Sequence, residues 1–113
     1  MLKLDFEYRK GLLFVRLEGI LNKETGIEFS NKIKELIYKY GIKYFVINLK
    51  DLLFMDEDGA EILKKSYYDM IVHDGKLIIC NYQDTLYKDT IESRFDDCYK
   101  IRNELEAFRL INV

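Results

Sequence analysis

Proline and tryptophan are absent from this chain of 113 residues, and histidine occurs once. Because no proline, serine-glycine linker, repeat or low-complexity stretch interrupts the chain, we expect one domain over residues 1–113. The single histidine, His73, cannot form a histidine metal cluster, and a cysteine-histidine dyad would need it beside Cys80 or Cys98. We place His73 at the surface near a helix C-terminus. These shortages remove most common catalytic arrangements, and we expect no metal site or cofactor.

Cysteine is scarce too, and no run of basic residues is present. Cys80 and Cys98 have apolar neighbours and no C-x-x-C spacing, which predicts reduced, buried thiols in a reducing compartment. Lysine and arginine total 18 against 20 aspartate and glutamate residues, a formal net charge of -2. A nearly balanced charge without a basic patch argues against nucleic acid as a partner.

Long apolar runs are missing as well. The longest candidates, residues 44–49 and 77–80, are far shorter than the roughly 18 residues of a membrane span. Residues 1–4 begin an alternating pattern instead of a signal peptide. We therefore expect a soluble cytoplasmic protein that neither spans nor binds a membrane.

The hydrophobic pattern that is present begins with alternation. Apolar and charged residues alternate over residues 2–8, Lys10-Gly11 supplies a turn, and Leu13, Val15 and Leu17 alternate again before Gly19. This pattern predicts a two-stranded antiparallel hairpin.

Two amphipathic helices follow, each with apolar residues three and four positions apart. The first begins after Asn22 as N-cap and ends at Gly41, and the second begins at Asp56 and ends near residues 73–75. The predicted inner positions are Phe29, Ile33, Leu36, Ile37 and Tyr40 in the first helix and Ala60, Leu63, Tyr67, Met70 and Ile71 in the second.

The remaining elements are shorter. Residues 44–49 and 77–80 are apolar with little alternation, as expected for strands covered on both faces, and Tyr99 and Ile101 mark a fifth strand. Asp84 is predicted to cap a third helix, and Asn103 a last one with Glu106 completing a capping box. Their predicted inner positions are Tyr87, Ile91 and Phe95, then Leu105, Phe108 and Ile111. The fold class is therefore α/β, a mixed sheet of about five strands with about four helices in the order β-β-α-β-α-β-α-β-α, the later strands parallel.

Residues 48–59 carry the clearest functional signal. Sites in open α/β sheets lie beyond the carboxyl ends of strands, and this segment ends in Asp56-Glu57-Asp58-Gly59 at a helix start. Carboxylates here cap free N–H groups and complement the helix dipole. Gly59 costs up to about 1 kcal/mol of helix propensity relative to alanine, and its bare backbone permits close approach by another molecule.

The sequence resembles the STAS domains, in particular the single-domain anti-sigma-factor antagonists of bacteria. The resemblance covers nearly the whole chain. It rests on Gly19-Ile20-Leu21-Asn22, where the family often has Gly-x-Leu-Asp, on residues 45–49, and on Phe54-Met55-Asp56-x-x-Gly59, where the family typically reads Phe-Met-Asp-Ser-Ser-Gly. Residues 75–81 and 103–107 also look like the family's later segments.

The resemblance implies a binding protein that is not an enzyme. Such antagonists bind an anti-sigma factor that is also a serine kinase, and phosphorylation of the second serine of Asp-Ser-Ser-Gly switches them off. Here Glu57 and Asp58 replace both serines, so serine phosphorylation at this position is impossible. Asp58 presents a permanent negative charge instead. The protein is then a constitutively active antagonist, a constitutively weak binder that imitates the phosphorylated form, or a member with a different partner.

The predicted partner-binding face joins this segment to the start of the first helix. Leu52, Phe54 and Met55 belong to an apolar stretch in a predicted loop, where at least two of residues 52–55 plug the end of the sheet and the rest form a small interface core. The predicted site residues are Asn22, Leu52, Phe54, Met55, Asp56, Glu57, Asp58 and Gly59, with Asp58 at the phosphoacceptor-equivalent position.

Two alternatives remain open. A structural STAS subunit of a larger signalling or transport assembly would keep the fold and change the task. A magnesium-dependent enzyme would use Asp56, Glu57 and Asp58 as oxygen ligands. Against this enzyme, the sequence has no phosphate-binding glycine loop or evident general base, and three adjacent residues at a helix start point in different directions.

Overall fold

Five strands form one mixed sheet in the computed structural model, which describes residues 1–111. They are β1 (Leu2–Arg9), β2 (Leu12–Leu21), β3 (Tyr44–Met55), β4 (Lys76–Cys80) and β5 (Tyr99–Ile101), in that spatial order. Strand β1 is antiparallel to β2, and β2 through β5 are mutually parallel. The predicted hairpin and the parallel later strands are confirmed.

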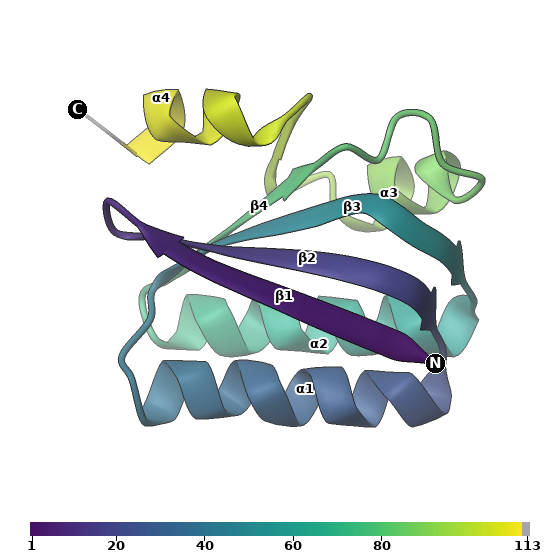
Figure 1. Ribbon diagram of the computed structural model, residues 1–113, viewed down its shortest axis with the longest axis horizontal. Helices are drawn as coiled ribbons and strands as arrows, with labels where there is room; N and C mark the ends of the chain where they lie inside the picture. The colour runs from purple at the N-terminus through teal and green to yellow at the C-terminus, as the bar shows by residue number, and fades with distance from the viewer. Residues whose placement is uncertain (112–113) are drawn as a thin grey trace.

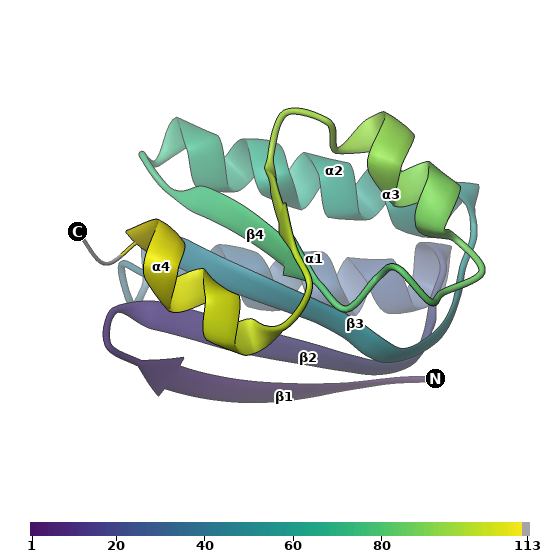
Figure 2. The same cartoon turned by 90° about the horizontal axis from the view of Figure 1, so that it is seen from above.

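Helices cover both faces of this sheet (Figures 1 and 2). They are α1 (Lys23–Tyr38), α2 (Glu57–Val72), α3 (Lys88–Arg94), the 3-10 helix η1 (Glu104–Glu106) and α4 (Ala107–Ile111). Helices α1 and α2 lie side by side under one face, and α4 crosses the other (Figure 1). The predicted order of strands and helices is confirmed.

The two faces explain why the central strands lack alternation. Leu13, Val15 and Leu17 of β2 face the core under α1 and α2, while Leu12 and Phe14 face a second core against α4. The predicted alternation of Leu13, Val15 and Leu17 is confirmed, and the other face of β2 is also buried at its start, because α4 covers it.

Several predicted inner positions of the helices lie at the surface instead. Tyr40, Ile71 and Leu105 are exposed. Helix α1 ends at Tyr38, so Tyr40 lies beyond its last turn, and Leu105 belongs to the 3-10 segment before α4. The side chain of Ile111 lies outside the described residues.

The predicted cap at Asp84 is wrong, and the cap at Asn103 is right. Thr85 donates from its backbone N to Tyr82 O at 3.1 Å, which makes a turn, and α3 begins only at Lys88. Asn103 accepts a hydrogen bond from Glu106 N at 3.3 Å. The Glu106 carboxylate accepts from Arg102 N at 3.2 Å, one residue before the position that a capping box requires.

Ser66 provides a stability test inside α2. Its hydroxyl is fully buried and has no hydrogen-bond partner among the described residues. Because a buried unsatisfied hydroxyl is unfavourable, we expect Ser66→Ala to leave the free energy of unfolding unchanged or to raise it by about 1 kcal/mol. Urea unfolding measures the effect.

Thr25 is the matched control for Ser66. Its buried hydroxyl donates to Ile20 O at 3.0 Å and accepts from Asn22 N at 2.9 Å. Thr25→Ala should therefore lower the free energy of unfolding by about 1 kcal/mol. Equal losses in the two variants would contradict the assignment of an unsatisfied hydroxyl at Ser66.

Candidate protein-binding site at the start of α2

Residues 52–55, predicted as a loop, are the end of strand β3. Beyond Asn48 this strand has left β4 and pairs only with β2, as far as Leu21 opposite Met55. Two register shifts interrupt the pairing with β2. Such bulges turn consecutive side chains to the same side. Leu52 and Met55 consequently point into the core, with 2% and 8% of their surface exposed, whereas Leu53 and Phe54 point outward, with 74% and 50% exposed.

A tyrosine hydroxyl supports this part of β3 from the side that β4 has left. The buried Tyr87 hydroxyl lies 2.6 Å from Leu52 O and 3.2 Å from Leu49 O, and it can donate to one of them at a time. Burial raises the pKa of Tyr87, so the hydroxyl keeps its proton. Tyr87 was predicted only as an apolar inner residue, and its contact with β3 has no signal in the sequence.

Helix α2 begins as predicted. Asp56 is its N-cap, and its Oδ1 accepts a hydrogen bond from Gly59 N at 2.8 Å. Asn22 likewise caps α1, with Oδ1 3.0 Å from Thr25 N. The two caps line the same hollow, together with Lys23, Glu24 and Ile27. The structure therefore brings Asn22 next to Asp56, two of the predicted site residues.

Gly59 is required by the chain's own backbone, not by another molecule. A Cβ atom at this position would lie 2.1 Å from Leu21 O and 2.7 Å from Leu21 C. Asp56 N also donates to Leu21 O, at 3.3 Å. The first turn of α2 thus packs directly on the end of β2. The prediction that Gly59 admits another molecule is corrected, because that side of the glycine is filled.

The two carboxylates that replace the family's serines have different surroundings. Glu57 is 80% exposed at its side chain and forms an ion pair with Arg94 at the end of α3. Arg94 also contacts Glu61, with Nη1 3.2 Å from its Oε1. Asp58 has no ion pair within 4.0 Å among the described residues. Of the three carboxylates at residues 56–58, Asp58 is thus the one that neither caps the helix nor has an ion pair among the described residues.

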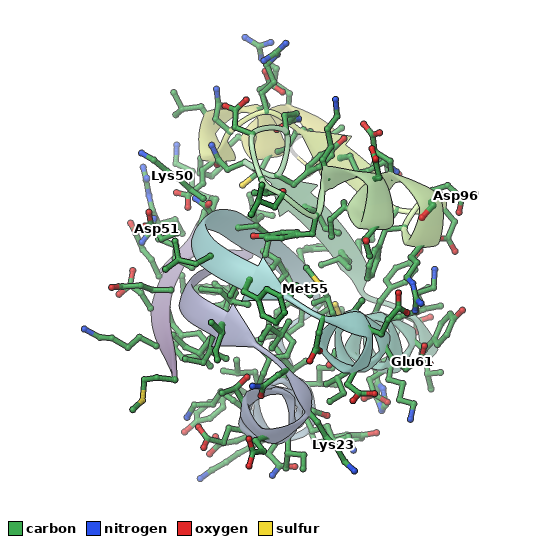
Figure 3. The ribbon with its side chains drawn as sticks, turned by 90° about the vertical axis from the view of Figure 1, so that its right-hand side faces the viewer. Lys23, Lys50, Asp51, Met55, Glu61 and Asp96 are labelled. Carbon is green, nitrogen blue, oxygen red and sulfur yellow. The ribbon has the colours of Figure 1, made fainter. Side chains whose placement is uncertain are left out.

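Asp58 borders a shallow groove between α1 and α2. The groove has a volume of about 420 Å³, and Ile27 and Ile62 form its apolar part. Lys23 of α1 and Glu61 of α2 mark its two sides (Figure 3). The complete lining is Lys23, Ile27, Ser30, Asn31, Lys34, Asp58, Glu61, Ile62 and Lys65. Two carboxylates, three lysines and two isoleucines are suited to binding a protein segment.

The magnesium alternative gains no support from the geometry. Asp56 faces its own helix as a cap, Glu57 faces Arg94, and Asp58 faces the groove. Within residues 1–111, no three His, Cys, Asp or Glu side chains cluster so as to hold a metal ion. The three carboxylates therefore do not converge on one point.

The two cysteines and the histidine were considered as reactive residues in the sequence, and the structure shows their surroundings. Cys80 is buried, which raises the pKa of its thiol to about 12, and both cysteines are free. Cys98 is only half-buried, less than predicted, and burial raises its pKa to about 11. His73 follows α2, as predicted, and its ring packs edge-on against Tyr38. None of the helices over residues 1–111 is long and apolar enough to cross a membrane.

The chain is similar in fold or in sequence to several anti-sigma factor antagonists. The fold is shared with the solved anti-sigma factor antagonist SpoIIAA in its unphosphorylated form, with a TM-score of 0.78 at 18% identity over all of both chains. An anti-sigma factor antagonist from Mycobacterium paratuberculosis gives 0.79 at 16% identity, over 100% of this chain and 96% of that one. In sequence, the anti-sigma F factor antagonist of Paenibacillus polymyxa is 26% identical over 87 residues, 77% of this chain and 74% of that protein.

A family model that matches most of the sequence identifies the family of this chain. The family model of the STAS domain matches residues 3–107. The chain therefore belongs to the STAS domain family, and the resemblance seen in the sequence is confirmed.

Proposed function

We propose that this chain is a cytoplasmic, non-enzymatic regulator of the anti-sigma-factor-antagonist type, consisting of a single STAS domain. It binds a serine-kinase anti-sigma factor through the surface made by Asn22, Phe54, Glu57 and Asp58. Leu53 joins this surface, because it is the most exposed apolar side chain of β3. Leu52, Met55 and Gly59 were also predicted as site residues, but they are not part of the proposed surface because all three are buried.

The observation that carries the proposal is the exposed pair Leu53 and Phe54 at the end of β3, the strand that leads directly into the helix turn carrying the unpaired carboxylate of Asp58. Exposed apolar side chains with a charged rim have the composition of an interface core. Asp56 contributes through its position as cap, since it fixes the first turn that carries Asp58.

The charge at Asp58 decides how the partner is bound. We propose that Asp58 imitates the phosphorylated form, so that the natural protein binds the anti-sigma factor weakly. Arg94 pairs with Glu57, so of the two carboxylates that replace serines the one at position 58 is unpaired, at a groove that also carries Lys23, Lys34 and Lys65. A fixed charge facing an acidic or ATP-loaded surface lowers affinity by repulsion.

The test is calorimetric titration of the purified cognate serine-kinase anti-sigma factor with the natural protein and with Asp58→Ser. We expect Asp58→Ser to bind about ten-fold more tightly, equivalent to about 1.4 kcal/mol, and to accept phosphate from ATP. Asp74→Asn removes the same charge at the far end of α2 and should leave the affinity unchanged. If neither the natural protein nor Asp58→Ser binds, the proposed function is wrong. If both bind equally, only the role of the charge at Asp58 is wrong.

A further inference from the structure

Strand β1 forms a free edge of the sheet. It is the first strand in the spatial order, and nothing among the described residues pairs with its outer side (Figure 2). An open edge of eight residues presents unpaired backbone N–H and C=O groups, which natural proteins usually cover or interrupt. This edge can therefore pair with a further strand.

The backbone groups that point outward belong to the even-numbered residues. Met1 O accepts a hydrogen bond from Ile20 N at 3.0 Å, and Met1 continues the β1–β2 register by one position. Because backbone groups alternate in direction along a strand, odd-numbered residues bond to β2. Leu2, Leu4, Phe6 and Tyr8 consequently direct their N–H and C=O groups away from the sheet.

The side chains of β1 separate by the same parity. The even-numbered ones are apolar and lie on the face of α1, where Leu2, Leu4 and Phe6 pack on the margin of the core. Tyr8 is 61% exposed. The odd-numbered ones are charged and lie on the opposite face with Arg16: Lys3, Asp5, Glu7 and Arg9.

We propose that β1 pairs antiparallel with β1 of a second copy of this chain, with the two Asp5 residues at the two-fold axis. In this register Leu4 lies opposite Phe6 of the second copy, and Leu2 opposite its Tyr8. All outward backbone groups of residues 2–8 then form hydrogen bonds. On the other face, Lys3 lies opposite Glu7 of the second copy, and the symmetry repeats each contact.

Charge and parity select this register over its neighbours. A shift by one residue would place even-numbered residues, whose backbone N–H and C=O groups point outward, opposite odd-numbered residues, whose groups point to β2. No ladder of hydrogen bonds could then form. A shift by two in one direction places Asp5 opposite Glu7 and Lys3 opposite Arg9, which repel. A shift by two in the other direction places Lys3 opposite Asp5, which attract, but it leaves Tyr8 without a partner and so forms fewer backbone hydrogen bonds. In the chosen register only the two Asp5 carboxylates repel, and each is bound to its own Arg16 at 2.8 Å.

Sedimentation velocity of the full chain over a series of concentrations tests the dimer. We expect a concentration-dependent dimer for the natural protein and a dissociation constant about ten-fold higher for Lys3→Glu, because this change places glutamates opposite each other twice. Lys88→Glu, an exposed position on α3, changes the charge equally and should dimerise like the natural protein. A natural protein that stays monomeric up to its solubility limit overturns the proposal, as does equal weakening by both variants.

Amide hydrogen exchange locates the interface. We expect the amides of Leu4, Phe6 and Tyr8 to exchange fast in dilute solution and to become protected as the concentration rises. The amides of Asp5 and Glu7 bond to β2 in either state and should stay protected throughout. A dimer in which the even-numbered amides remain unprotected would place the contact elsewhere and overturn the proposal.

Discussion

Gly59→Ala is expected to lower the free energy of unfolding by about 1–3 kcal/mol or more, although alanine is the better helix former. The added Cβ would meet Leu21 O at 2.1 Å and Leu21 C at 2.7 Å. Both atoms belong to the backbone at the end of β2, so neither can rotate away. The first turn of α2 must move instead, and with it the capping bond from Gly59 N to Asp56. Urea unfolding followed by circular dichroism measures the loss.

Gly26→Ala is the matched control, because Gly26 also lies in the first turns of a helix. A Cβ at this position would approach Ile62 Cδ1 at 2.5 Å. That atom ends a side chain that can adopt another rotamer at a cost of order 0.5–1.5 kcal/mol while the helix gains propensity. Ile62 Cγ2 and Cβ, at 3.2 and 3.3 Å, must also move slightly. We expect a smaller loss of stability than for Gly59→Ala. If both variants lose the same stability, the contact of Gly59 with Leu21 is looser than described.

Periodicity sufficed to predict the order of elements and both long helices. Helix α1 begins after Asn22 and α2 after Asp56, where the capping residues predicted them. Local chemistry determines these features, since a cap acts on the next three residues and a helical stripe repeats within one element. The exposed positions of Tyr40 and Ile71 show that the same pattern is less reliable in the last turn.

The extension of β3 and the surroundings of the carboxylates could not be read from the sequence. Strand β3 continues past Asn48 because its backbone groups form hydrogen bonds with β2 and with the Tyr87 hydroxyl. Tyr87 is 35 residues from Leu52 in the sequence. Likewise Arg94 is 37 residues from Glu57. Three consecutive carboxylates look equivalent in a sequence. The cap at Asp56 is a local feature, but a contact over such a separation decides that Glu57 is paired and Asp58 is not.

A charged network on the opposite face carries the second large prediction. Arg16 donates from Nε and Nη2 to both carboxylate oxygens of Glu104, each at 2.8 Å. It also contacts Asp5 at 2.8 Å and Glu7 at 2.7 Å. Asn48 donates to Glu104 Oε2 at 2.8 Å. The network therefore fastens η1, the segment that leads into α4, to three strands.

We expect Arg16→Gln to lower the free energy of unfolding at neutral pH by about 2–3 kcal/mol. The pair is only partly buried, so the loss lies below that of a fully buried ion pair. Glutamine cannot reproduce the two-pronged contact and leaves Asp5, Glu7 and Glu104 without their cation. Lys32→Gln, which breaks the exposed pair of Lys32 and Glu35, should cost no more than about 0.5 kcal/mol.

The dependence on pH distinguishes the network from simple packing. The hydrogen bonds from Arg16 hold the pKa of Glu104 below its ordinary value in the folded state. The unfolded chain therefore binds more protons, so this stabilisation is present above the unfolded pKa of about 4.3 and is lost as pH falls through the folded pKa. Arg16→Gln removes the largest cause of this lowered pKa and should flatten this acidic part of the stability curve. A curve as steep as that of the natural protein would place the acid sensitivity in other carboxylates, even if the variant were less stable at neutral pH.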